Sequence, residues 1–209
     1  MAARKGFLLV TMEPPAAIEE EFNDWYDSEH VPERLAVQGF ETATRYVSTA
    51  GWPKYCAFYD LSAPEVIDSC GYRAISGDNF SPWTKRMLAR VRGFYRTFGE
   101  QIHPGAAPTA PATRTLLIRL GNVAAVSEDS WVTSARQAFE GHENVRTVRV
   151  FRSSAAGGGS LLALVELGAP LNVGAPELRA LGELAEHVDL VNEYALLSHH
   201  AHRAPAGLR

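Results

Sequence analysis

The 209-residue chain has only two cysteines, Cys56 and Cys70, and it has no apolar run long enough to cross a bilayer. Two cysteines provide no disulfide framework, and a spanning helix needs about 20 apolar residues. The first residues lack the charged segment and apolar run of a signal peptide. Basic residues form no long run and the net charge is -4, whereas nucleic-acid binders carry basic surfaces. We therefore expect a soluble cytoplasmic protein with neither a membrane nor a nucleic-acid partner.

What the chain does contain is an internal repeat, the feature to seek first because it sets the architecture. Cys56–Pro64 reads CAFYDLSAP and Leu162–Pro170 reads LALVELGAP, so Asp60 and Glu166 align at an offset of 106 residues. Shorter segments upstream, TRYV and VRVF, also match, and each has an arginine in its second position. The sequence therefore predicts two copies of one unit.

Each copy has the order strand, helix, strand, strand, helix, strand, which is the ferredoxin-like or split βαβ pattern. A four-stranded sheet with helices on one face must bury its other face. The sequence thus predicts an α+β fold of two tandem ferredoxin-like (βαββαβ) units, packed sheet to sheet as an intrachain dimeric α/β barrel. We place the first unit at residues 1–103, a Pro- and Ala-rich linker at 104–113, and a degenerate second unit, which ends in a flexible tail, at 114–209. The predicted helices are Ala16–Val37, Pro64–Ile75 with Pro82–Arg90, Glu128–Glu140, and Pro176–His187.

The segment Phe22–Phe40, FNDWYDSEHVPERLAVQGF, has the densest concentration of chemically useful side chains. Pro32 disfavours helix at the residue before it, so the first helix is expected to break near His30. Histidine suits proton transfer near neutral pH. We therefore predict His30 as a general base or acid, with Glu29 or Asp27 orienting it.

A structural interpretation of the same segment stands beside this one. The charged residues around His30, including Glu33 and Arg34, would then be a solvated helix end with local ion pairs.

Aromatic residues elsewhere in the first copy could wall a small-molecule pocket. The predicted substrate-binding residues lie on the first helix, on the second and third strands, and in a segment that the second copy lacks. In the alternative interpretation, these side chains only fill the core. They are Trp25, Tyr26, Arg45, Tyr46, Tyr59, Phe80 and Trp83, the last two as a lid over His30.

The tail contains three histidines, His199, His200 and His202, which could in principle ligate a metal. No cysteine or carboxylate joins them locally, and chain ends are usually frayed. A haem would need an axial histidine in a pocket, and no further histidine lies at such a position. We therefore predict no metal and no cofactor.

The pattern W-x-x-x-x-H-x-P, formed by Trp25, His30 and Pro32, resembles the hallmark of the EthD-like branch of the dimeric α/β-barrel superfamily. The segments ATRY and SPWTKRM add to a resemblance that covers residues 6–102, whereas the second copy shares only the strand pattern. The resemblance implies that small aromatic ligands are held between sheet and helices. It also implies activities that range from cofactor-free oxygenation to isomerisation, dehydration and haem chemistry. It also implies a catalytic role for His30.

We expect a cofactor-independent enzyme that acts on a hydrophobic aromatic or cyclic molecule by acid/base chemistry, as a lyase, dehydratase or isomerase. Tyr26 and Arg45 would stabilise an enolate-like oxygen. A cofactor-free monooxygenase and a non-catalytic small-ligand-binding protein remain as alternatives. The expected partner is a small-molecule substrate, and a homodimer of the whole chain is left open.

Overall fold

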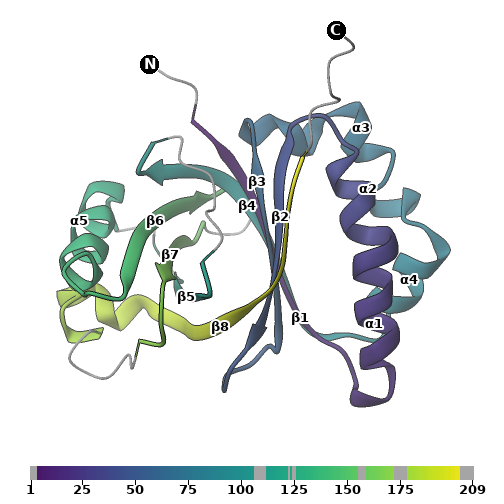
Figure 1. Ribbon diagram of the computed structural model, residues 1–209. Coiled ribbons are helices and arrows are strands. Elements are labelled where there is room, and N and C mark those ends of the chain that lie inside the picture. The colour runs from purple at the N-terminus through teal and green to yellow at the C-terminus, as the bar shows by residue number, and fades with distance from the viewer. Residues whose placement is uncertain are drawn as a thin grey trace, which may run out of the picture.

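The computed structural model describes residues 4–105, 112–121, 123, 126–154, 159–171 and 178–202. These residues form eight strands that close into one antiparallel barrel in the order β1-β3-β2-β8-β5-β7-β6-β4 (Figure 1). The strands are β1 (Gly6–Glu13), β2 (Phe40–Ser48), β3 (Tyr55–Leu61), β4 (Arg92–His103), β5 (Arg114–Leu120), β6 (Val145–Ser153), β7 (Leu161–Leu167) and β8 (Val188–Ala201).

Both halves of the barrel have the ferredoxin-like strand order, with the first and third strands of each copy in the centre. The order is β4-β1-β3-β2 in the first half and β6-β7-β5-β8 in the second. Two further pairs, β2 with β8 and β4 with β6, join the halves. The predicted α+β fold is therefore confirmed, and each described strand pairs with a neighbour on both sides.

The helices cover the outside of the barrel, with α1 to α4 on one side and α5 on the other (Figure 1). No helix in the described part of the chain is long and apolar enough to cross a membrane. The helix predicted at Pro64–Ile75 is instead a 3₁₀ segment followed by one α-turn, and the start of the one predicted at Pro176–His187 lies outside the described residues. The α-helices are α1 (Glu19–Trp25), α2 (Val31–Leu35), α3 (Cys70–Arg73), α4 (Pro82–Leu88) and α5 (Glu128–Phe139).

Alternation along the strands divides the apolar residues into three cores, because successive side chains point to opposite faces of a sheet. Outward-facing residues such as Leu8 and Tyr59 pack under α1 to α4, and others such as Ile118 pack under α5. Inward-facing residues such as Phe7 and Phe58 fill the barrel. An eight-stranded barrel has just enough internal space for side chains, so its interior is a packed core.

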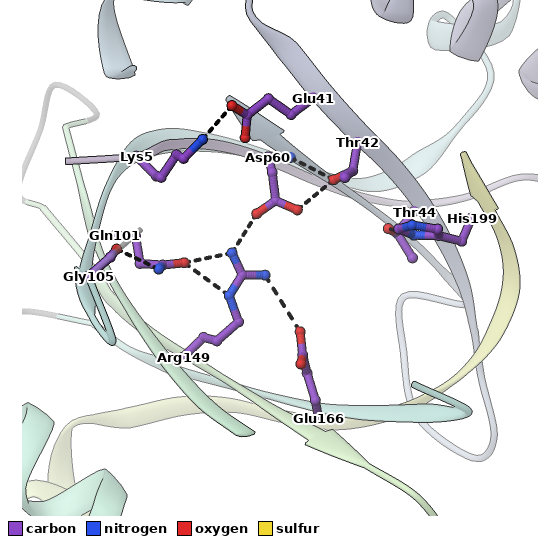
Figure 2. Close-up of polar contacts among 10 residues, drawn as sticks. All are labelled: Lys5, Glu41, Thr42, Thr44, Asp60, Gln101, Gly105, Arg149, Glu166 and His199. Atoms are coloured by element: carbon purple, nitrogen blue, oxygen red, sulfur yellow. Dashed lines mark hydrogen bonds and ion pairs between the residues drawn. The ribbon is translucent and has the colours of Figure 1, made fainter. Parts of the chain in front are cut away.

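A buried ionic network lies inside this barrel and connects the two halves (Figure 2). The guanidinium of Arg149 donates to Asp60 and, from Nε at 2.9 Å, to Gln101 Oε1. Its Nη1 lies 3.6 Å from Glu166 Oε1. Thr42 donates to the other oxygen of Asp60. The two acidic residues that define the sequence repeat therefore meet at one arginine.

The two arginines that match in the sequence repeat face opposite sides of the sheet. Arg45 pairs with Ala57, which lies three residues before Asp60 on β3. Arg149 pairs with Leu164, which lies only two residues before Glu166 on β7. A shift of one residue exchanges the two faces of a strand. Arg45 accordingly points to the helices and Arg149 into the barrel, so they are not structural equivalents.

The network predicts that substitutions of two arginines on β6 differ strongly in their effect on the free energy of unfolding. Arg149→Met leaves Asp60 and Glu166 buried without their cation, so we expect a loss of roughly 3–5 kcal/mol in unfolding free energy. Arg152→Met removes only exposed ion pairs with Glu100 and Glu128, so we expect a loss below about 1 kcal/mol. Urea unfolding of both variants measures the difference, and equal losses would contradict the central role of Arg149.

Candidate functional site

A small cavity lies between the outer face of the first sheet and the helices that cover it. Its volume is about 30 Å³, enough for one or two water molecules. We call it the His30 cavity. Its walls come from strands β1, β3 and β4 and from the helical side, and they are formed by Leu8, Val10, Met12, His30, Arg34, Tyr59, Tyr72, Phe80, Leu88, Phe94 and Arg96.

A π-helical segment, η2 (Tyr26–His30), presents His30 to the cavity. The sequence predicted a helix break before Pro32, but α2 continues through this proline. The π-turn before Pro32 accommodates the proline within the helix, because it shifts the backbone hydrogen-bonding register. Such turns are frequent at functional sites. The backbone N–H of Val31 donates to the carbonyl of Tyr26, one register step longer than in an α-helix.

His30 is buried, with 8% of its surface exposed, and its Nδ1 has no hydrogen-bond partner. Its ring packs against Trp25, at 4.4 Å between centroids, and against Tyr26, at 5.2 Å. Burial lowers the pKa of His30 well below its usual value, and the positive charges of Arg34 and Arg45 lower it further. The imidazole is therefore neutral at pH 7 and has a nitrogen available to accept a proton.

The two carboxylates expected beside His30 have other partners. Asp27 Oδ1 accepts from Arg45 Nη1 at 2.6 Å. Glu29 Oε1 accepts from the hydroxyls of Ser81 and Thr84, at the start of α4. The expected carboxylate–imidazole pair therefore does not form among the described residues.

Only two of the seven predicted pocket residues line the His30 cavity. Tyr59 and Phe80 line the His30 cavity. Trp25 and Tyr26 support the His30 ring from its other side, and the indole N–H of Trp25 donates to Thr84. Trp83 packs against the outer core of the first half without lining the cavity.

Arg45 and Tyr46 cannot belong to one site, because neighbours on a strand point to opposite faces. Tyr46 lies inside the barrel. Arg45 lies on the helical side, but its guanidinium packs 4.4 Å from the ring centre of Tyr26 and donates to Asn23 and Asp27. Neither residue lines the His30 cavity.

Two cavity arginines were not among the predicted site residues. Arg34, interpreted from sequence as part of a solvated helix end, is 2% exposed, and its Nη1 donates to the carbonyl of Ile75 at 3.2 Å. Arg96 Nη2 donates to the hydroxyl of Tyr72 at 3.0 Å. The sequence contained one signal for Arg34, which follows His30 by four positions. Residues four apart share a helix face.

The described residues form no metal-binding cluster, and the His30 cavity is too small for a haem. No group of three or more His, Cys, Asp or Glu side chains in the described ranges could hold a metal ion. In the histidine-rich tail, His199 Nδ1 bonds the hydroxyl of Thr44 at 2.8 Å and His202 Nδ1 bonds the carbonyl of Leu35 at 2.9 Å. A porphyrin is much larger than the 30 Å³ beside His30, so a haem does not fit there.

The lowered pKa of His30 predicts a pH-dependent stability. Because the folded pKa lies below the unfolded value of about 6.5, the unfolded chain binds the proton first as the pH falls. The stabilising contribution is full above about pH 6.5 and is lost as the pH falls toward the folded pKa. We expect His30→Asn to flatten the fall in urea midpoint between about pH 7.5 and about pH 5.

The exposed His200 provides the control for this measurement. His200→Asn should leave the pH dependence as in the wild type, because it removes no buried imidazole. An unchanged slope in His30→Asn would show that His30 is not held neutral by burial.

No family model and no curated protein matches the chain by sequence. Solved structures do match. An anthrone oxidase-like protein has a TM-score of 0.66 at 10% identity, over 99% of this chain and 96% of its own. A monooxygenase-like protein from Lactobacillus acidophilus NCFM has a TM-score of 0.57 at 7% identity, over 95% and 97%.

A variant chlorite dismutase from Candidatus Nitrospira defluvii has a TM-score of 0.60 at 9% identity, over 95% of this chain and 93% of its own. At these identities the likeness shows the fold and leaves the reaction open. The chain therefore has the dimeric α/β-barrel fold, with both halves of the barrel in one polypeptide.

Proposed function

We propose that this protein is a cofactor-independent oxygenase of the EthD-like branch, which acts on a hydrophobic aromatic molecule in the His30 cavity. One observation carries the proposal. A buried imidazole, kept neutral and without a partner at Nδ1, faces an apolar cavity that also contains two guanidinium groups.

The chemistry would begin with proton transfer. The imidazole takes a proton from an acidic C–H of the substrate, and the electron pair stays on the substrate as a carbanion or enolate. The guanidiniums of Arg34 and Arg96 stabilise the developing negative charge. The imidazolium that forms is then paired with the new anion, which offsets the burial that disfavours it in the empty site.

Dioxygen would be the oxidant in the next step. The carbanion gives up electrons to O₂ and a C–O bond forms. The His30 imidazolium returns its proton to the peroxide anion, and the resulting hydroperoxide loses water to leave a carbonyl. A CH₂ group and O₂ are thereby converted to C=O and H₂O, so neither flavin nor metal is needed for the balance.

The structural neighbours favour oxygenation over the acid/base chemistry expected from the sequence. Among the matching structures, one is described as anthrone oxidase-like and two as monooxygenases. An anthrone has the kind of C–H that a neutral histidine could deprotonate, because the product anion is aromatic.

A lyase or isomerase is the second candidate, and the same buried neutral His30 favours it. Such an enzyme would share the proton transfer but would not consume oxygen. Turnover in the absence of dioxygen therefore separates the two.

An aromatic substrate needs more room than the closed cavity offers. Phe80 closes it from the helical side, and Phe94, which is 50% exposed, borders it on β4. Outward rotation of these rings would admit a ligand without changing the barrel. Phe80 thus retains the lid role predicted from sequence as part of this proposal.

We expect the wild-type protein to convert anthrone to anthraquinone with uptake of one O₂ per product, and to lose this activity under nitrogen. His30→Ala should lower kcat by about 10²–10⁴-fold, the usual contribution of a general base, with an unchanged circular dichroism spectrum. His200→Ala is the matched control, because His200 is exposed and distant in sequence from η2.

An oxygen electrode and absorbance at the quinone band measure both quantities. Equal turnover by His30→Ala would refute the assignment of the base. Product formation without oxygen would instead support the lyase or isomerase.

A further inference from the structure

Two cavity residues, Arg34 and Arg96, point to the class of substrate. We propose that the His30 cavity selects an aromatic molecule carrying an acidic oxygen, a carboxylate or phenolate, and that Arg96 and Arg34 bind its oxyanion. This deepens the proposed function and rests on it for the identification of the cavity as the substrate site.

The charges that line the cavity are of one sign. Arg34 and Arg96 contribute two guanidiniums, and no Asp or Glu is among the lining residues. The nearest recorded carboxylate is Glu33, whose Oε2 is 4.0 Å from Arg34 Nη1, at the outer limit of an ion pair. Arg96 forms no ion pair in the part of the chain that the structure describes.

Most donor groups of the two arginines lack a recorded protein acceptor. A guanidinium has five N–H donors. Arg34 uses one for the Ile75 carbonyl and Arg96 uses one for the Tyr72 hydroxyl. Arg34 is 2% exposed, whereas Arg96 is half-buried. A buried cation is unfavourable unless an anion pairs with it, so an oxyanion in the cavity would give Arg34 a closer anionic partner than Glu33.

Tyr72 brings the two arginines to one place. The Cζ atoms of Arg34 and Arg96 lie 5.4 Å and 5.9 Å from the centre of its ring. Arg34 also lies 5.9 Å from the ring centre of Phe80. Both guanidiniums therefore flank the same aromatic wall, where a planar substrate could stack while its oxygen accepts their hydrogen bonds.

The remaining wall suits an aromatic body. Leu8, Val10 and Met12 present three apolar side chains from β1, and Tyr59 adds a ring from β3. An inorganic anion would gain nothing from these surfaces, and a neutral hydrocarbon would leave both arginines unpaired. The combination favours an amphiphilic aromatic anion.

The test compares two probes of similar shape that differ in charge, 2-naphthoate and methyl 2-naphthoate, in calorimetric titrations of the full chain. We expect the carboxylate to bind wild-type protein at least about tenfold more tightly than the ester, because charge-assisted hydrogen bonds are the stronger ones. Arg96→Gln should abolish that preference, because it weakens binding of the carboxylate far more than binding of the ester.

Arg92→Gln is the matched control, because Arg92 is an exposed arginine on the same strand. Arg34→Gln is expected to act like Arg96→Gln, but Arg34 is buried and its variant needs a check of folding. The experiment is repeated in Phe80→Ala, in which the cavity is wider. Equal binding of both probes, an unchanged preference in Arg96→Gln, or no binding even to Phe80→Ala overturns the proposal.

The experiments distinguish a failure of the anion-binding inference from a failure of the proposed oxygenase. His30→Ala should keep the preference for the carboxylate, because the arginines remain. Selective anion binding without oxygen-dependent turnover of any aromatic would support this inference and refute the proposed oxygenase. Oxygen-dependent turnover of neutral aromatics by a protein without anion preference would support the proposed oxygenase and refute this inference.

Discussion

Closure of the barrel is the constraint on which the other features depend. Each described strand is hydrogen-bonded to a neighbour on both sides, so the inward or outward direction of every strand side chain is fixed by the pairing register. Inside, the register brings Asp60 and Glu166 to Arg149 (Figure 2). Outside, it presents Tyr59 and Arg96 to the helices. The ionic network and the candidate site are thus opposite faces of the same sheet.

The two halves share this framework but differ in what they add to it. The first half carries α1 to α4 and the π-turn that presents His30. In the second half, α5 buries Trp131 completely, at 0% exposure, yet has no histidine followed by proline. The second half completes the barrel with β5 to β8, and the first supplies the cavity. A duplicated unit can diverge in this way because closure needs both sheets but only one site.

The His30 cavity combines mostly apolar walls with two guanidiniums and has no carboxylate among its lining residues. Burial lowers the pKa of the His30 imidazole, and the charges of Arg34, in the cavity, and of Arg45, outside it, oppose its protonation further. A bound anion reverses that balance, since it would pair with the arginines and with an imidazolium. Arg34, which helps to lower the pKa of His30 in the free protein, would therefore favour proton transfer once an acidic substrate is present.

Local sequence was sufficient to predict the repeat, the strands and the ferredoxin-like order, because these depend on the period of apolar residues and on prolines and glycines between elements. It also singled out His30, through its spacing from Trp25 and Pro32. It could not decide which partners Asp27 and Glu29 take, since those partners, Arg45 and Ser81, come from distant segments. Nor could it place Tyr46 inside the barrel, or Arg34 and Arg96 in the cavity. Those positions depend on strand register and helix packing between distant segments, and a single-residue change of register sends a side chain to the other face of the sheet.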